Sequence, residues 1–363
     1  MPPAIIDPWG STLPEDYTQI VAEFGLEQFD PALFPDATTA MRRGIVFAGR
    51  DLKIIADCIA NKKPFYALTG IMPTADRVHF GNKLVVESLR YFQDHGAKTY
   101  ILVADLEAMA TRGVTLEEAQ HRALDFHIPA YIALGLDPKN TTFYFQSENH
   151  EVSRLGYEFA KRITYNEFKA IYGSADPGRI MAAMTQVGDI LFPQLEERMP
   201  GIIPVGIDQD PHIRLTRDIA RRTASKYKFW APSSLYNKYT PALDGGLKMS
   251  KSKPETCIEL PDDPDKTCKR LKSALTGGRD TVEIQRKLGG EPEKCMIFEL
   301  YKQHLLPDDK DLSKVYKDCR AGVLMCGPDK ARSCELMSAY MKNFAKELEA
   351  ARKKVDKLHF IGR

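Results

Sequence analysis

Apolar runs and amphipathic stretches alternate along the chain from about residue 64 onward. Three continuously apolar runs predict buried strands, because a strand covered on both faces has no polar side: 64–70, 98–106 and 141–146. Two amphipathic stretches between them, 80–96 and 115–136, predict helices. The second opens with the capping pattern of Thr115 and Glu118. Such alternation predicts a parallel sheet with right-handed crossovers.

The second half of the chain is mostly helical. Helical character from about 151 to 198 is followed by one more apolar strand, 201–210, and its helix, 211–222. Further helices are predicted at 263–275, 293–304, 311–320 and 328–356. We therefore predict an α/β fold, a doubly wound parallel sheet of Rossmann type with a helical insertion at about 110–200, plus an all-α C-terminal domain. The predicted parts are an N-terminal extension packed on the α/β domain, 1–60, the α/β domain itself, 61–260, and the helical domain, 261–363.

Composition narrows the class of protein without naming a partner. With 363 residues, of which 43% are hydrophobic, the chain can bury a sizeable core, and its net charge is only +2. From Pro261 to Arg363, Lys and Arg outnumber Asp and Glu by 22 to 17. A mildly basic C-terminal third suits a phosphate-rich partner, and it suits an ordinary solvated helical surface equally well.

The cysteines and the terminal segment indicate a soluble, cytoplasmic protein. Seven cysteines are scattered without a CxxC pair or a histidine at zinc-ligand spacing, which predicts buried thiols in a reducing compartment and no structural metal site. No apolar run is long enough to span a bilayer, and the N-terminus lacks the pattern of a signal peptide. We expect neither a membrane nor DNA as a partner.

The stretch TGIMPTADRVHFGNK, 69–83, carries the first candidate site. A strand ends at Gly70, and His79, Gly81 and Asn82 open the following helix. Free N–H groups at a helix start favour phosphate, and Gly81 allows close approach. The structural alternative is that His79 only caps or packs the helix.

Two later stretches carry further candidates. In VGIDQDPH, 205–212, a strand ends at Gly206, and Asp208 could accept both hydroxyls of a ribose or simply cap the next helix. In LDGGLKMSKSKPET, 243–256, Lys248 and Lys251 lie on a glycine-flanked loop with small hydroxyl residues. Two flexible cations can neutralise the charge that develops on a departing pyrophosphate. A solvated polar turn is the alternative.

Other nucleotide-binding patterns are missing. The chain has no GxxxxGK[ST] loop, and TGGRD at 276–280 lacks both the lysine and a preceding strand. A GxGxxG fingerprint is also absent, so kinase, GTPase and dehydrogenase hypotheses lose their main support.

With HxGN, a split sheet and KMSKS in that order, the chain resembles a class I aminoacyl-tRNA synthetase of the HIGH/KMSKS type. Segments across nearly the whole chain are similar to tryptophanyl-tRNA synthetases of the archaeal and eukaryotic type: DPWG (7–10), MRRGIVFAGRD (41–51), IDQDPHIRLTRDIA (207–220) and TGGRDTVEIQRKLGG (276–290). GDIL, 188–191, resembles the amino-acid pocket helix shared by tryptophanyl and tyrosyl enzymes.

The resemblance implies an enzyme that activates tryptophan with ATP and Mg²⁺ and transfers it to tRNA(Trp), working as a homodimer. It makes 61–260 the catalytic domain and 261–363 the anticodon-binding domain. Catalytic roles are implied for Lys248, Lys251, His79 and Asn82. Contacts to ATP are implied for Gly70, Gly81, Gly206, Asp208, Met249 and Ser250, and contacts to tryptophan for Asp189, Gln186, Gln209 and Glu107. Asp189 is expected to accept the indole N–H, although a helix surface charge or cap is the alternative, and Glu107 could equally be a loop carboxylate in solvent.

The pattern of the family is not followed everywhere. Leu68 stands where a tyrosine is expected before the Thr-Gly of the first strand, Leu102 where a glutamine is expected, and Ala182 where bacterial tryptophanyl and tyrosyl enzymes carry tyrosine. A tyrosyl-tRNA synthetase therefore stays open, because Asp189 could accept from a phenol as well as from an indole. Two further hypotheses also stay open, a synthetase-like RNA-binding protein without activity and a small nucleotidyltransferase.

Overall fold

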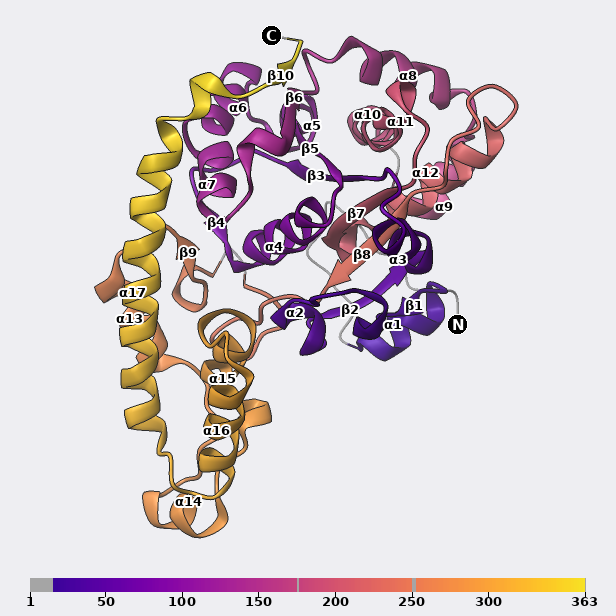
Figure 1. Cartoon of the computed structure of the whole chain (residues 1–363). Helices are drawn as coiled ribbons and strands as arrows, with labels where there is room; N and C mark the ends of the chain where they lie inside the picture. Colours follow the sequence, from indigo (N-terminus) through magenta and orange to yellow (C-terminus); the bar gives the residue numbers. More distant parts are fainter. Residues whose placement is uncertain (1–15, 175, 250–252, 363) are drawn as a thin grey trace.

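The computed structural model describes residues 16–174, 176–249 and 253–362. It has a broad body built on a large sheet and a narrower body of helices below it (Figure 1). The long helix α17 (Cys326–Arg352) runs along both bodies. Ser250, Lys251 and Ser252 of the KMSKS stretch lie outside the described residues.

An eight-stranded sheet crosses the broad body in the order β1–β2–β8–β7–β3–β5–β6–β10. Its five central strands are parallel: β8 (Ser233–Asn237), β7 (Gly201–Gly206), β3 (Tyr66–Ile71), β5 (Lys98–Val103) and β6 (Thr141–Phe145). The chain adds β5 and β6 on one side of β3, and β7 and β8 on the other. This strand order confirms the predicted doubly wound sheet. The strand order reverses between β3 and β7, and doubly wound sheets bind ligands at that point.

Side chains alternate between two cores on the two faces of the sheet. Along β5, Ile101 and Val103 belong to the buried cluster on the first face, and Tyr100 and Leu102 to the cluster on the second. Both faces are covered, which explains why the strands read as continuous apolar runs. Helices α3 (Leu52–Ala60), α4 (Phe80–Asp94) and α7 (Ile128–Ala133) contribute to the first face together with α17. Helices α8 (His150–Ala160), α9 (Tyr165–Tyr172), α10 (Pro177–Leu191) and α12 (Asp210–Arg222) cover the second.

Shorter elements complete the broad body. The remaining α-helices are α1 (Tyr17–Glu23), α2 (Thr39–Arg42), α5 (Asp105–Arg112), α6 (Leu116–Arg122) and α11 (Pro193–Glu196). A π-helical segment, η2 (Ala123–His127), joins α6 to α7, so the predicted single helix at 115–136 contains a wider turn. Single 3₁₀ turns lie at Pro31–Leu33, Pro138–Asn140, Ile207–Gln209, Pro254–Thr256, Pro292–Lys294 and Val355–Lys357.

Four strands of the large sheet escape prediction from the sequence. The N-terminal segment supplies β1 (Glu27–Gln28) and β2 (Val46–Arg50), which pair antiparallel with the edge at β8. At the other edge, β10 (Phe360–Ile361) pairs with β6. The strand β8 has the polar residues Ser233, Ser234 and Asn237 in buried positions, so its apolar pattern is too weak to mark it.

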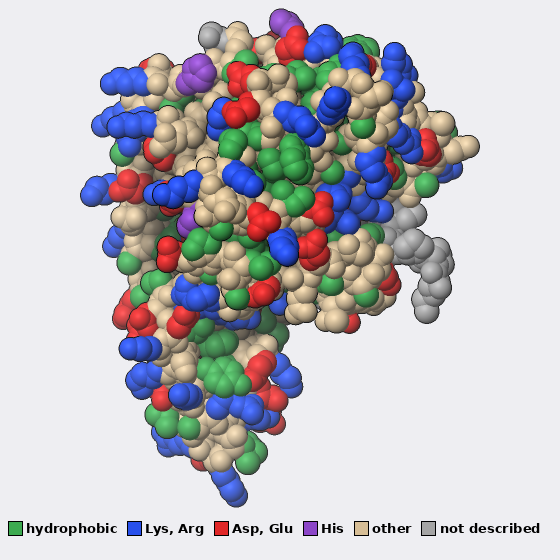
Figure 2. Space-filling model, turned by 45° about the vertical axis from the view of Figure 1, so that its right-hand side comes forward, with side chains coloured by type: hydrophobic (Ala, Val, Ile, Leu, Met, Phe, Trp, Pro, Cys, Tyr) green, Lys and Arg blue, Asp and Glu red, His purple; other side chains and the backbone are tan. Residues whose placement is uncertain are grey.

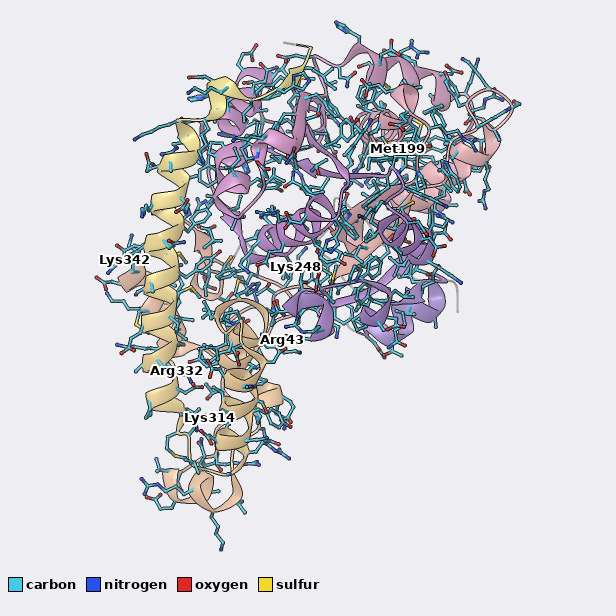
Figure 3. All side chains as sticks on the ribbon, viewed as in Figure 1. Arg43, Met199, Lys248, Lys314, Arg332 and Lys342 are labelled. Atoms are coloured by element: carbon cyan, nitrogen blue, oxygen red, sulfur yellow. A yellow bond between two sulfur atoms is a disulfide. The ribbon has the colours of Figure 1, made fainter. Side chains whose placement is uncertain are left out.

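The narrow body consists of α13 (Pro264–Ser273), α14 (Val282–Leu288), α15 (Met296–Leu300), the π-helical η7 (Tyr301–Leu305), α16 (Asp309–Arg320) and part of α17. Arg43, next to α2, ties it to the broad body, as its position between the bodies in Figure 3 suggests. Arg43 Nη1 donates to the carbonyls of Lys302 and Leu306, each at 2.8 Å, and its Nε bonds Asp309 at 2.7 Å.

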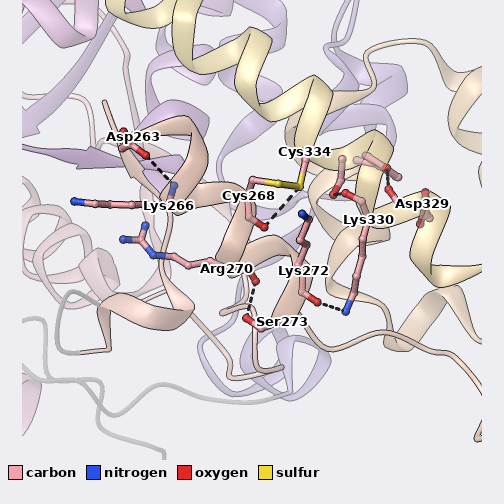
Figure 4. The surroundings of a disulfide bond; sticks show 11 residues. Asp263, Lys266, Cys268, Arg270, Lys272, Ser273, Asp329, Lys330 and Cys334 are labelled. Atoms are coloured by element: carbon pink, nitrogen blue, oxygen red, sulfur yellow. Dashed lines mark hydrogen bonds between the residues drawn. A yellow bond between two sulfur atoms is a disulfide. The ribbon is translucent and has the colours of Figure 1, made fainter.

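The expectation that every cysteine is a thiol is wrong for two of the seven. Cys268 on α13 and Cys334 on α17 form a disulfide, with their Cα atoms 5.0 Å apart (Figure 4). They are separated by 66 residues, and only the packing of α13 against α17 brings them together. The remaining thiols are those of Cys58, Cys257, Cys295, Cys319 and Cys326. Within the described ranges, no helix is both long and apolar enough to cross a membrane.

Candidate active site

A cavity of about 550 Å³ opens at the carboxyl ends of β3 and β7, where the strand order reverses. Segments from all three candidate motifs line it, although they are far apart in the sequence. The predicted site residues in its wall are Gly70, His79, Gly81, Asn82, Glu107, Gln186, Gly206, Asp208, Gln209, Lys248 and Met249. Ser250 and Lys251 lie outside the described residues, and Asp189 is not part of the wall.

The HFGN stretch forms a reciprocal cap at the start of α4. The Nδ1 atom of His79 accepts from the backbone N–H of Gly81 at 3.1 Å, and Asn82 Oδ1 accepts from the backbone N–H of His79 at 3.1 Å. A Cβ atom on Gly81 would lie 2.9 Å from the His79 ring, so a larger residue would push that ring aside. His79 therefore does cap the helix, as the structural alternative predicted. The cap also holds the side chains of His79 and Asn82 at the cavity, next to the positive N-terminal end of α4.

A two-stranded ribbon joins the HFGN stretch to the segment that follows KMSKS. In it, β4 (Val78–His79) pairs antiparallel with β9 (Glu259–Leu260), with His79 opposite Glu259. Arg77, which also lines the cavity, forms an ion pair with Glu259 at 2.5 Å. Backbone hydrogen bonds between β4 and β9 and the Arg77–Glu259 ion pair thus link the HFGN stretch to the segment after KMSKS.

The end of β7 supplies the second motif. A Cβ atom on Gly206 would collide with Asp208 Oδ1, so a larger residue here would displace the Asp208 carboxylate, which points back across this position. Tyr239 donates its hydroxyl to Asp208 Oδ1 at 3.3 Å. Burial raises the pKa of Asp208, and the charge of Lys248 partly opposes that rise.

Lys248 and Met249 begin the KMSKS stretch at the junction of the two bodies, where Lys248 is seen in Figure 3. The Nζ atom of Lys248 lies 5.7 Å from the centre of the Tyr239 ring, a cation–π distance. Met249 is buried: its N–H donates to the carbonyl of Thr240 at 3.0 Å, and its sulfur accepts from the N–H of Ile258 at 3.4 Å. These contacts anchor the start of the stretch against the cavity wall.

The other half of the cavity is apolar with a polar rim. Its aliphatic wall consists of Leu68, Leu102, Ala104, Ile190, Ile203, Val205 and Ile213. On the rim, Gln186 Nε2 donates to Gln209 Oε1 at 3.3 Å, next to the buried Glu107. Gln186 Oε1 has no hydrogen-bond partner among the described residues, so it is an acceptor that a bound ammonium group could satisfy.

Asp189, which is predicted to accept the indole N–H, lies behind the cavity wall in this structure. It is fully buried, and its two oxygens accept from Tyr144 Oη at 3.1 Å and from Gln146 Nε2 at 2.6 Å. The other amide atom of Gln146, Oε1, accepts from the backbone N–H of Glu107 at 3.3 Å. Burial raises the pKa of Asp189 to about 8. The carboxyl group therefore supports Glu107 from behind the wall. A helix surface charge or cap is wrong for Asp189, and its contact with an indole N–H stays a prediction.

Several wall residues carried no assigned role in the sequence, among them Arg77, Arg112, His127, Tyr131 and two further groups. One follows β8, from Asn237 to Thr240, and no motif marks it. The other is His212, within the quoted DQDPH stretch, whose Nδ1 lies 2.9 Å from the Tyr172 hydroxyl. Burial lowers the pKa of His212 to about 3, so its ring is neutral at neutral pH. Its position in the sequence, four residues after Asp208, could have marked His212 as a candidate wall residue.

Comparison with known proteins agrees with this geometry. Residues 60–341 match the family model described as tRNA synthetases class I (W and Y). The chain is 43% identical to the tryptophan–tRNA ligase of Hyperthermus butylicus and 42% identical to that of Methanocaldococcus jannaschii, in each case over 96% of both chains. The crystal structure of tryptophanyl-tRNA synthetase from the hyperthermophilic archaeon Aeropyrum pernix superposes with a TM-score of 0.89 at 40% identity, covering 98% of this chain and 99% of that one.

Proposed function

The chain belongs to the class I tRNA synthetases of the tryptophan and tyrosine group, and we propose that it is an enzyme that joins tryptophan to tRNA(Trp). The observation that carries this proposal is the single cavity in which Lys248, the HFGN cap and Asp208 meet an aliphatic pocket. The choice of tryptophan as the substrate rests on the full-length similarity to tryptophan–tRNA ligases.

In the first step, the carboxylate of tryptophan attacks the α-phosphorus of ATP, and pyrophosphate leaves. Lys248 and Lys251 neutralise the charge that grows on the pyrophosphate. His79 and Asn82 hold the phosphates beside the N-terminus of α4, with Gly70 and Gly81 permitting close approach. The protein supplies position and charge in this step, and no general base is assigned.

Other groups in the wall take the nucleoside. Gly206 and Asp208 hold the ribose, because the carboxylate can accept from both hydroxyls. In this proposal Met249 lies near the adenine, and Ser250, which is outside the described residues, is a further contact to ATP. Mg²⁺ enters bound to the ATP phosphates; in the described parts of the chain, no cluster of three or more His, Cys, Asp or Glu side chains is placed to hold a metal ion.

Gln209, Gln186 and Glu107 bind the α-ammonium group of tryptophan at the polar rim. The indole ring occupies the aliphatic half, between Leu68 and Leu102. An indole N–H and a phenol O–H would both need a hydrogen-bond partner against these leucines, so they do not discriminate between the two amino acids. The full-length similarity to tryptophan–tRNA ligases favours tryptophan over tyrosine.

Assembly and location follow as part of the proposal. Met109, Tyr157 and Met181 are 46%, 71% and 44% exposed on the mutually packed helices α5, α8 and α10, as a homodimer contact in the helical insertion would require. The helices of 261–363 form the anticodon-binding domain, the segment 1–60 extends the catalytic domain 61–260, and tRNA lies across both bodies. Figure 2 shows Lys and Arg side chains on the narrow lower body, interspersed with acidic and hydrophobic ones.

We place the enzyme in the cytoplasm, where its tRNA substrate is used. The Cys268–Cys334 disulfide does not oppose this location, since intracellular proteins of hyperthermophilic archaea often carry disulfides, and a similar solved structure comes from such an organism.

The test is amino-acid-dependent exchange between ATP and labelled pyrophosphate, with tryptophan and tyrosine supplied separately. Exchange with tryptophan alone supports the proposal. Exchange with tyrosine alone would establish the reaction with the other substrate of the family. No exchange with either, in folded protein that binds ATP, would favour a synthetase-like RNA-binding protein without activity.

A further inference from the structure

The helical run from Leu116 to Ala133 changes its winding once. It starts as α6, widens into the π-helical segment η2 over Ala123–His127, and returns to α-helix in α7. Such one-turn π-segments interrupt a regular ladder of hydrogen bonds and are frequent at functional sites. In this protein, the segment faces the loop that leads from β3 to the HFGN cap.

Three side chains of this run donate to carbonyl groups at the end of β3 and in that loop. Tyr131 Oη lies 3.4 Å from the carbonyl oxygen of Gly70, and Arg122 Nη1 lies 3.3 Å from that of Thr74. The shortest contact joins His127 Nε2 to the carbonyl oxygen of Ala75 at 2.7 Å. Because a carbonyl oxygen can only accept, Nε2 carries the proton in this contact.

The wider turn is what puts Arg122 and His127 on one side of the helix. In a regular α-helix with 3.6 residues per turn, two residues five positions apart point about 140° away from each other. One extra residue in the turn brings the fifth residue nearly back over the first. The following α-helical turn then places Tyr131, four positions on, beside His127. A uniform helix over 116–133 could not present all three donors to one loop.

The loop depends on such outside donors. It leaves the sheet after Ile71 and re-enters paired structure at Val78, and between these points it closes one tight turn, from the N–H of Thr74 to the carbonyl of Met72 at 2.9 Å. Thr74 and Ala75 are half-buried, and the helix provides hydrogen-bond partners for their carbonyl groups. His127 is 5% exposed, so water cannot replace it easily.

We propose that the π-helical segment is a positioning device for the ATP site, and that His127 is its central positioning residue. By holding Ala75, His127 fixes the loop that delivers Arg77 and His79 to the cavity. This inference rests on the proposed function, since it assigns the loop to ATP. His127 acts through the loop backbone and takes no part in the chemical step.

The test compares His127→Ala with His127→Gln, because the glutamine Nε2 can reach the same carbonyl group. His127→Ala should raise the KM for ATP about tenfold, the ratio expected for the loss of one buried hydrogen bond, while the KM for tryptophan changes by less than about twofold. His127→Gln should restore most of the loss. Tyr131→Phe, which removes only the hydroxyl group, should raise the KM for ATP by a smaller factor.

Gln93→Ala is the matched control. Gln93 is similarly buried, and its Nε2 donates to the carbonyl groups of Asp137 and Asn140, each at 3.1 Å, in a loop that does not line the cavity. The Gln93→Ala variant should lower the free energy of unfolding without changing the KM for ATP. The inference would be wrong if His127→Ala changed both KM values and kcat in the same proportion. It would also be wrong if His127→Gln failed to restore the KM for ATP.

Hydrogen–deuterium exchange of the full-length protein separates this inference from the proposed function. His127→Ala should speed exchange of the amides at 72–79, and Gln93→Ala should not. Unchanged exchange there would overturn the positioning role whatever the activity. The two proposals can also fail separately. If His127→Ala speeds amide exchange at 72–79 but the wild type shows no pyrophosphate exchange, the positioning role is supported and the proposed reaction is refuted.

Discussion

Replacing the buried carboxyl of Asp189 by an amide should change how stability depends on pH. Asp189 is fully buried and bonded to Tyr144 and Gln146. Burial raises its pKa from the ordinary value of 3.8 to about 8, with the charges of Glu107 and Asp105 adding to the rise and the two donors opposing it. The folded protein therefore keeps this proton over a range of pH where the unfolded chain has lost it.

The sign and the size follow from proton linkage. A group whose pKa is higher in the folded state contributes stability that is complete below the unfolded pKa and disappears as pH rises through the folded pKa. Between pH 5 and pH 7, both well inside the window from 3.8 to about 8, the folded state holds about one proton more. The free energy of unfolding then falls by about 1.4 kcal/mol per pH unit from this group, or about 2.7 kcal/mol over the two units.

Urea unfolding of the wild type and of Asp189→Asn at pH 5, 6 and 7 measures this difference. All other titrating groups are common to both proteins, so the difference between their unfolding free energies isolates Asp189. It should shift by about 2.7 kcal/mol in favour of Asp189→Asn from pH 5 to pH 7. Asp94→Asn is the control, because this exposed carboxylate pairs only with Arg90 one turn away, and its curve should run parallel to that of the wild type. A difference between the wild type and Asp189→Asn that stays constant with pH would refute the reasoning.

Three further changes test the site and the scaffold. Lys248→Ala should lower the rate of pyrophosphate exchange at saturating substrates about 10²–10³-fold, with tryptophan binding in equilibrium dialysis unchanged; a loss below threefold would count against its role. Arg77→Glu and Glu259→Arg should each raise the KM for ATP about threefold, and the double charge reversal should recover most of the loss; no recovery would mean that the pair does not act as a unit. Replacing Cys268 and Cys334 by serine should lower the free energy of unfolding in urea by about 2–4 kcal/mol while leaving exchange at 25 °C within about twofold. Equal stability of variant and oxidised wild type would contradict a structural disulfide.

Local pattern was enough for the parts of this protein whose chemistry lies within one short stretch. The apolar runs of β3, β5, β6 and β7 and the cap of α4 follow from neighbouring residues, because burial on both faces and helix capping leave marks within a few positions. The motifs at His79, Asp208 and Lys248 are equally local, and the alternation of strand and helix requires their strand ends to share one edge of the sheet. The class of fold and the meeting of these three motifs at one cavity were therefore predictable.

Only the tertiary structure decided what depends on partners far along the chain. Asp189 is buried behind the cavity wall, where Tyr144 and Gln146, more than 40 residues away, donate to its oxygens. The strand β8 is held by its neighbours on both sides and not by its own polar sequence, and Cys268 meets Cys334 because two helices pack. The direction of a side chain and the partner of a buried polar group are set by long-range packing, and the spacing of residues along one helix or strand carries no information about them.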